Sequence, residues 1–368
     1  MACCGMISAR SAVPERFADS VRMDEVIVTG SRPAVNLRNL PMSVSVVEER
    51  QIERRFEPSL LPVLTEQVPG LFITGRGVMG YGVAAGAAGG MKIRGVGSEP
   101  TSGVLVLIDG HPQYMGLMGH PLADSYQSMN AERVEVVRGP ASILYGSNAM
   151  GGVVNIITKK GQADGVYNTA RLMYGSFNTL NVEVSNAVRK GKFNSFAALN
   201  YSRTDGHRKN MGFGGWGGYL KLGYDFTAHW KAFADVNLNH FAASNPGSVT
   251  APLIDNDALI TRGMTSFSLD NRYERTSGSL KFFYNFGYHK IDGHSPGQPS
   301  PDYRFRSRDR MLGITAYQSY RLFTGNQTTL GADYQRSGGR AWNRYPDRDE
   351  QLADKTLNDV AVYLNMQQ

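Results

Sequence analysis

The second half of the chain, from about residue 165, alternates between apolar and polar positions. In residues 179–188, Leu180, Val182 and Val184 share one face, opposite Asn181 and Glu183. A period of two is typical of β-strands, in which successive side chains point to opposite faces. The pattern predicts ten antiparallel strands, at residues 166–174, 179–188, 193–203, 218–226, 230–241, 264–274, 279–290, 310–322, 327–336 and 358–367.

The predicted connections alternate in length after a first tight turn at residues 175–178. Short turns at residues 189–192, 227–229, 275–278 and 323–326 alternate with long ones at 204–217, 242–263, 291–309 and 337–357. Short turns on one side and long loops on the other are typical of a transmembrane β-barrel. Tyr and Phe near strand ends, at 174, 241, 273 and 288, agree with aromatic girdles at the membrane interfaces. A soluble β-sandwich also alternates, but gives no reason for loops to lengthen on one side only.

The first half has a different, α+β pattern between residues 24 and 160. Short apolar strands are predicted at residues 24–30, 40–47, 104–108, 132–137 and 153–158, and helices at 48–55 and 59–67. Residues 75–90 are rich in glycine and predict a flexible loop, and Asp109-Gly110 is a turn signal after the most apolar strand.

Composition and charge narrow the class of protein. Glycine accounts for 42 of 368 residues, and charged residues for only 19%. The apolar runs are too short for a transmembrane helix, and the adjacent Cys3 and Cys4 cannot form a disulfide framework. The net charge is +7, but the densest basic stretch, residues 304–310, contains Asp309 and is expected to be a loop, so we expect no nucleic-acid partner. Residues 1–23 show no legible signal peptide and remain unassigned.

Four motifs in the first half carry a family resemblance. They read MKIRG at residues 91–95, VLVLIDG at 104–110, ERVEVVRGPAS at 132–142 and LYGSNAMGGVVNIIT at 144–158. In order and spacing this stretch resembles the plug domain of TonB-dependent outer-membrane receptors, over about residues 24–160. The resemblance implies a plug domain at residues 31–162, followed at 163–368 by part of an outer-membrane β-barrel, with about ten of the 22 strands of the family.

The resemblance also implies contacts for particular residues. Residues 24–30 look like the family's TonB box, which recruits the TonB energy-coupling protein and could do so by adding a strand to a partner sheet; an ordinary first plug strand is the alternative. The box residues are Asp24, Glu25, Val26, Ile27, Val28 and Thr29. Plug arginines of the family pair with barrel glutamates, so we expect plug–barrel locking at Arg94, Arg138, Glu132 and Glu135; solvated turn arginines are the alternative.

An iron complex, such as a siderophore or haem, is the ligand that the family implies, with cobalamin or a glycan left open. Imidazole and phenolate groups ligate haem iron, which makes His111, Tyr114 and His120 candidates beside Met79 and Tyr81. These histidines could equally belong to ordinary turns, so no metal site and no resident cofactor are predicted. We expect no enzyme, because the glycine-rich loop lacks a phosphate-loop ending and no nucleophile elbow is present.

Ten strands leave the predicted barrel unclosed. Open sheet edges leave unpaired backbone groups in lipid, so we expect this chain to be an N-terminal piece of a receptor of the Gram-negative outer membrane. There are two alternatives: a plug that acts alone in binding or signalling, and a non-functional truncated receptor.

Overall fold

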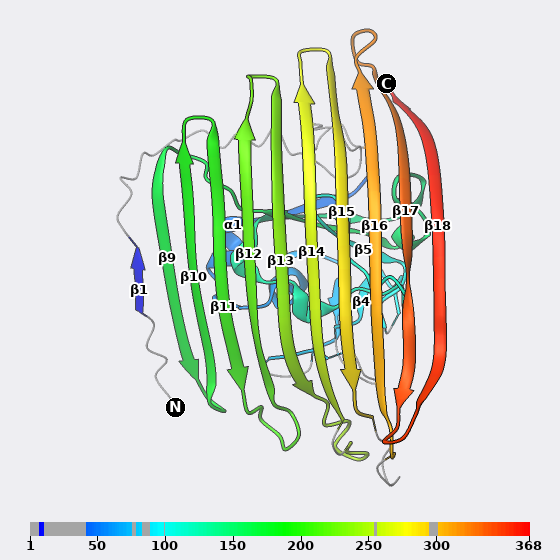
Figure 1. The fold of residues 1–368 in the computed structure, drawn as a ribbon. Helices are drawn as coiled ribbons and strands as arrows, with labels where there is room; N and C mark the ends of the chain where they lie inside the picture. The colour runs from blue at the N-terminus through cyan, green and yellow to red at the C-terminus, as the bar shows by residue number, and fades with distance from the viewer. Residues whose placement is uncertain are drawn as a thin grey trace.

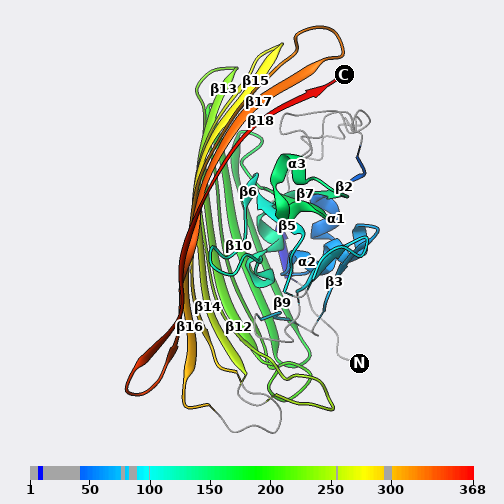
Figure 2. The same ribbon diagram turned by 90° about the vertical axis from the view of Figure 1, so that its right-hand side faces the viewer.

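The computed structural model describes residues 7–10, 42–75, 79–82, 89–98, 100–253, 256–293 and 301–368. A broad, curved antiparallel sheet forms one side of the molecule, and a smaller α/β domain, the plug, lies against its concave face (Figure 1, Figure 2). None of the helices in the described ranges is both long enough and apolar enough to cross a membrane.

The plug contains short strands and helices that agree with most of the predicted elements. Its strands are β2 (Val44–Glu48), β3 (Leu71–Ile73), β4 (Met91–Ile93), β5 (Val104–Ile108), β6 (His111–Pro112), β7 (Ala131–Arg138) and β8 (Gly152–Thr158). Its helices are α1 (Glu49–Glu53), α2 (Leu60–Gln67) and α3 (Ser142–Tyr145), with 3₁₀ turns at Ala123–Ser125, Ser128–Asn130 and Ser147–Ala149.

The plug sheet has the order β2-β7-β8-β5-β6, in which β5 and β8 run parallel and the other pairs antiparallel. All five residues of β5 are buried. Val104, Val106 and Ile108 join the main core with α2, whereas Leu105 and Leu107 pack in a second cluster on the other face. Burial on both faces explains why this strand is an uninterrupted apolar run rather than an alternating one.

The large sheet holds all ten strands predicted for the second half. They are β9 (Gly165–Gly175), β10 (Thr179–Lys190), β11 (Phe193–Thr204), β12 (Phe213–Asp225), β13 (Trp230–Ser244), β14 (Asp257–Arg272), β15 (Thr276–Ile291), β16 (Arg304–Tyr320), β17 (Gln327–Arg344) and β18 (Asp349–Gln367). Each pairs with its sequence neighbour, and β1 (Ile7–Arg10) pairs with the free edge of β9.

The two faces of this sheet are reversed relative to a soluble protein. Asn181 and Glu183 are buried on the concave face, whereas Val184 on the opposite face is 44% exposed and Leu199 is 62% exposed. The predicted separation of faces is therefore confirmed, with the polar face toward the plug. An outward apolar face and a polar interior are the arrangement of a barrel wall in lipid.

Most strands are longer than predicted, and parts of all four predicted long loops are wrong. Residues 213–217 are the start of β12, and residues 257–263 are the start of β14. Residues 337–357 form the ends of β17 and β18 around a tight turn at 345–348, and residues 304–310 are the start of β16. Both stretches carry polar or charged side chains on both faces, so they lack the apolar–polar contrast that a pattern of hydrophobicity can detect. Their backbones nevertheless continue the antiparallel ladder.

Candidate functional site

The turn after β5 brings the plug into contact with the large sheet. Asp109 and Gly110 both have positive φ angles, of 48° and 83°. The Asp109 carboxylate accepts hydrogen bonds from the Thr158 backbone N–H at 3.0 Å and the Thr158 hydroxyl at 2.5 Å. It also pairs with Nζ of Lys221 on β12 at 2.9 Å, and both side chains of this pair are less than a tenth exposed. The plug and the sheet are thus joined by a buried ion pair.

The electrostatics favour the ionised form of Asp109. Burial raises the pKa of this carboxyl, but the Lys221 ammonium and the two hydrogen bonds from Thr158 outweigh burial and hold the pKa below its ordinary value. The Asp109 carboxylate is therefore ionised at neutral pH, inside an interface where charges are costly unless they are partnered.

A second set of contacts extends this interface along residues 109–116. Lys281 Nζ on β15 donates to the Asp109 backbone carbonyl at 2.7 Å, and the Asn285 amide donates to the Pro112 carbonyl at 2.8 Å. The Gly116 N–H donates at 2.8 Å to Asp309 of β16, which in turn pairs with Arg262 of β14 at 2.6 Å. The plug segment after β5 is therefore held by side chains of β12, β15 and β16.

His111 lies inside this interface and not at an open ligand site. Its side chain is 1% exposed, and its ring centroid is 5.6 Å from that of Phe283. Burial, with a contribution from the nearby Lys281 charge, lowers the pKa of His111 to about 3. The imidazole is neutral at physiological pH. Within the described ranges no group of three or more His, Cys, Asp or Glu side chains is arranged to hold a metal ion.

The other predicted ligand residues fall in different places. Met79 and Tyr81 line a cavity of about 330 Å³ between the plug and β11–β13, at the end of the sheet with the longer connections. Tyr114 receives a hydrogen bond from Gln335 on β17. His120 is partly buried, with Nδ1 3.2 Å from the Pro121 carbonyl. The structure thus brings Met79 and Tyr81 together and separates them from His111, Tyr114 and His120.

The 330 Å³ cavity has a rigid plug side and an aromatic sheet side. The Asp124 carboxylate accepts hydrogen bonds from the backbone N–H groups of Tyr81, at 2.9 Å, and Gly82, at 2.8 Å. These two bonds hold residues 81 and 82 of the glycine-rich loop in place. On the sheet side, the rings of Phe213 and Phe241 lie 6.1 Å apart. Asn200, Ser202 and Asn239 add polar groups to the lining.

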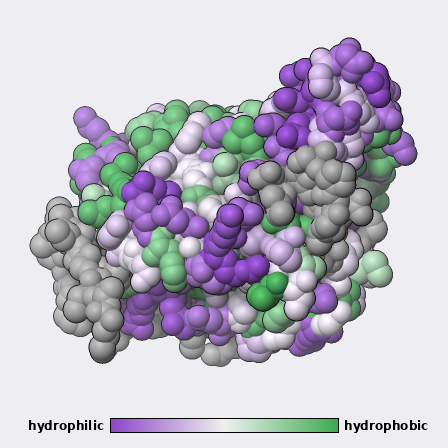
Figure 3. All heavy atoms as spheres, turned by 90° about the horizontal axis from the view of Figure 1, so that it is seen from below, coloured by the Kyte–Doolittle hydropathy of each residue, from purple (hydrophilic) through white to green (hydrophobic). Residues whose placement is uncertain are grey.

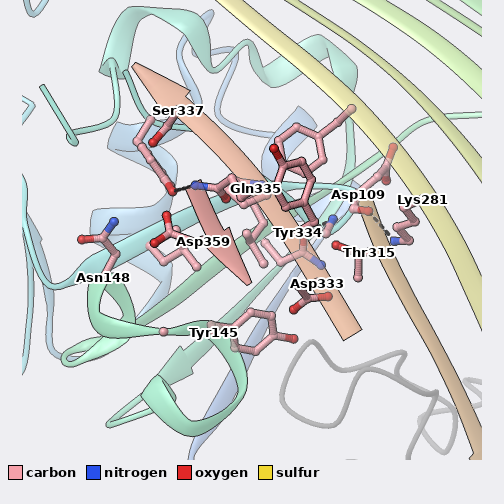
Figure 4. A pocket seen from close by; sticks show the side chains of 18 of the residues that line it. Asp109, Tyr145, Asn148, Lys281, Thr315, Asp333, Tyr334, Gln335, Ser337 and Asp359 are labelled. Carbon is pink, nitrogen blue, oxygen red and sulfur yellow. Dashed lines mark hydrogen bonds between the residues drawn. The ribbon is translucent and has the colours of Figure 1, made fainter. Parts of the chain in front are cut away.

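A larger cavity of about 1340 Å³ lies between the plug and the inner face of the sheet. It extends from Gly119, in the plug segment after β6, to Asp225 and Lys231, beside a short turn of the sheet. Figure 4 shows the side chains of Asp333 and Asp359 in this cavity, together with the plug residues Tyr145 and Asn148. Its lining is rich in charged groups, which suits a hydrated space.

Three of the four predicted locking residues, Arg138, Glu132 and Glu135, make polar contacts within the plug. Arg138 donates to the Pro69 carbonyl at 3.2 Å, and the Arg94 side chain is exposed on the turn after β4. Glu132 and Glu135 both pair with Arg133, at 3.3 and 3.0 Å. Plug–barrel locking by these four residues stays a prediction.

The contacts that do join plug and sheet were not predicted. Lys221 and Lys281 are polar residues at inward positions between apolar outward neighbours, whereas Asp309 lies between two outward arginines. That signal is present in the sequence, but the register that places Lys221 opposite Asp109 is a property of the folded chain. The predicted TonB box, Asp24 to Thr29, lies outside the described residues.

Comparison with known proteins supports this architecture. Residues 36–153 match the family model for the TonB-dependent Receptor Plug Domain. An iron-regulated outer membrane virulence protein of Vibrio cholerae serotype O1 is 35% identical over 167 residues, which cover 43% of this chain and 23% of the relative.

Solved structures share the fold at low sequence identity. The outer-membrane ferripyoverdine receptor of Pseudomonas aeruginosa matches with a TM-score of 0.70 and 14% identity, over 92% of this chain and 50% of that one. A copper transporter matches with a TM-score of 0.66 and 16% identity, over 88% of this chain and 50% of that one. The chain spans about half the length of these structures and less than a quarter of the curated relative. Residues 36–153 therefore match the plug domain of TonB-dependent receptors, and the strands that follow share the fold of part of the barrel in such a receptor.

Proposed function

We propose that this chain acts in an outer-membrane receptor that binds an iron complex, such as a siderophore or haem, in the 330 Å³ cavity between Tyr81 and β11–β13. The observation that carries the proposal is this cavity at the long-connection end of a plug-filled sheet. Long connections lie on the external side of outer-membrane barrels. The similar proteins include an iron-regulated outer-membrane protein and a receptor bound to ferripyoverdine, which supports iron as the cargo.

The lining of the cavity suits a compact ligand with apolar edges and polar groups. Its volume of about 330 Å³ lies at the lower end of the range typical of small-molecule sites. Phe213 and Phe241 supply apolar surface, and Asn200 and Asn239 supply amide groups for orientation. Because Asp124 anchors the backbone of Tyr81, the plug side of the site is organised before a ligand arrives.

Coupling to energy would act through the plug. We propose that Asp24 to Thr29 recruit the TonB energy-coupling protein, and that a pull on this segment loosens the contacts of the plug with the sheet. The large cavity beside Asp109 then marks the side on which a passage opens. The outward apolar face of β9–β18 would contact the outer-membrane lipid.

The binding step is testable with the full chain in detergent. Ferric complexes labelled with radioactive iron (a hydroxamate, a catecholate) and haem are each measured by equilibrium dialysis. We expect at least one to be retained, and Asp124→Ala to weaken its binding because the Tyr81 segment is released. Asp347→Ala, which removes an exposed carboxylate in the turn after β17, is the matched control. Retention of none of the three, or equal loss in both variants, would contradict the proposal.

A further inference from the structure

The outward face of β15–β17 carries a band of cations at the end with the longer connections. Along β16 the side chains alternate, with Ser307, Asp309 and Met311 buried toward the plug. The outward positions between them are therefore arginines. With their cross-strand neighbours they form the cation band, which we define as Lys290, Arg304, Arg306, Arg308, Arg310, Arg336, Arg340 and Arg344.

The register places like charges directly opposite each other in this band. Arg308 of β16 pairs with Arg340 of β17, and Arg306 pairs with Lys290 of β15. Like charges at opposed positions of an antiparallel pair destabilise a sheet unless anions compensate them. The band is therefore an unfavourable arrangement in isolation and a favourable one beside a multivalent anion.

The carboxylates of the chain compensate only part of the band. Asp292 pairs with Arg304 at 3.2 Å and with Lys290 at 3.7 Å, Asp354 pairs with Arg340 at 3.2 Å, and Asp349 pairs with Arg344. Among the described residues of the cation band, four arginines have no salt bridge; they are Arg306, Arg308, Arg310 and Arg336. The Arg308 guanidinium lies over the Tyr288 ring at 5.5 Å, which orders it without neutralising it.

The position of the band along the strands indicates the kind of anion. Toward the middle of the strands on the same face, Phe286, Phe282 and Ile314 are each about two-fifths exposed. Tyr284 and Leu312 share that face by register. Apolar and aromatic outward residues mark the depth of lipid acyl chains. The band overlaps their outer end, where Arg310 pairs with Phe286 and Arg336 pairs with Leu312. Viewed from the long-connection end, hydrophilic residues gather on the projecting corner formed by the β17–β18 hairpin, next to the band (Figure 3).

We propose that the cation band binds the phosphate groups of a phosphorylated glycolipid headgroup in the membrane leaflet on the long-connection side. Arginine guanidinium groups bind phosphate oxygens through paired N–H donors. Unpaired Arg308 and Arg310 lie two residues apart on one face, so two phosphates of one headgroup, or of adjacent lipids, can be bound together. The acyl chains of that lipid would cover the apolar residues toward the middle of the strands.

The test uses the full chain in a zwitterionic detergent and lipid A carrying two phosphates as the probe. The apparent dissociation constant is measured by native mass spectrometry for the wild type and for Arg308→Gln with Arg310→Gln. We expect about 30-fold weaker binding in the double variant, since each surface arginine near anionic lipid contributes roughly a fivefold effect. Arg308→Lys with Arg310→Lys keeps the charge and should retain most of the affinity.

The matched control removes two arginines at the opposite end of the sheet. Arg275→Gln with Arg321→Gln changes the net charge equally, at exposed residues of the short-turn end, and should leave lipid A binding unchanged. Dephosphorylated lipid should bind weakly to all variants, and inorganic phosphate should compete poorly because it has no acyl chains. The proposal would be overturned if both glutamine double variants weakened lipid A binding equally, or if the Arg308/Arg310 glutamine variant kept wild-type affinity. It would also be overturned if the wild type bound dephosphorylated lipid as tightly as lipid A.

Discussion

Lys221 of the large sheet and Asp109 of the plug form an ion pair of 2.9 Å with both side chains almost fully buried. Thr158 bonds to both partners, since its hydroxyl also lies 2.8 Å from Lys221 Nζ. A buried pair of this kind is costly to break from one side, because the remaining charge loses its partner without regaining water. The pair therefore specifies where the plug sits on the sheet.

A double-mutant cycle on this pair should show strong coupling. Asp109→Asn leaves the buried Lys221 charge unpaired and is expected to cost about 3–5 kcal/mol in the free energy of opening of the β5 amides. Lys221→Met combined with Asp109→Asn should cost less than the sum of the single changes, with a coupling of about 2 kcal/mol. Native-state hydrogen exchange of the full chain measures these free energies. The exposed pair Arg348–Asp347 should show negligible coupling, and additive effects at Asp109 and Lys221 would refute the role of the pair.

The buried His111 makes the plug sensitive to acid. Its pKa falls from 6.5 to about 3 on folding, first because it is buried and then because Lys281 is near. Between those two values the unfolded chain binds a proton that the folded chain does not, so stability decreases as the pH falls from 6.5 toward 3. The slope contributed by this one group is at most about 1.4 kcal/mol per pH unit.

The His111 contribution can be separated from that of the carboxyls. Asp109, whose pKa is lowered on folding, contributes stability that is complete above its ordinary value of 3.8 and is lost only below it. His111→Leu should therefore flatten the hydrogen-exchange stability profile between pH 4 and 6.5, whereas His207→Leu, at an exposed position, should not. An unchanged profile in His111→Leu would show that this histidine is not the titrating group.

Gly116 marks the closest approach of the plug backbone to the sheet. A Cβ atom at this position would meet the Arg310 backbone carbonyl and lie 3.1 Å from the Gly338 carbonyl oxygen, neither of which can turn aside. Gly116→Ala should therefore push the segment away from β16 and cost about 1–3 kcal/mol in β5 amide protection. Gly75→Ala, where a Cβ meets nothing within 4 Å, is the control within the plug. Equal protection in both variants would mean that the plug does not seat this tightly.

The proposed TonB box predicts a separable energy-coupling step. Deletion of residues 24–29 should abolish retention of the chain on an immobilised TonB periplasmic domain, because strand addition needs that backbone. Binding of an iron complex should be unchanged, since the described lining of the cavity at Tyr81 comes from plug residues from Glu57 onward and from β11–β13. Undiminished TonB retention after the deletion would place the contact elsewhere.

The alternation of apolar and polar residues predicts all ten strands of the large sheet. It does not predict their lengths or the contacts between the plug and the sheet. Val184 and Asn181 are recognisable in the sequence because an apolar outward face opposes a polar inward one. Arg308 and Asp309 are both charged, so the same pattern fails at the long-connection end and predicts a loop where β16 begins. His111 and Tyr81, two ligand candidates in the sequence, are separated because β6 turns into the interface with the sheet, whereas Tyr81 lines the cavity.

The most direct test of the proposed function locates the bound iron complex. Hydrogen exchange of the full chain is compared with and without whichever of the ferric hydroxamate, ferric catecholate or haem is retained in dialysis. The account predicts increased protection at residues 79–82 and at the cavity-lining ends of β11–β13, including Asn200 and Phe241. The proposed site would be contradicted if protection increased only at plug residues of the large cavity, such as Tyr145 and Asn148. It would also be contradicted if protection did not change at all.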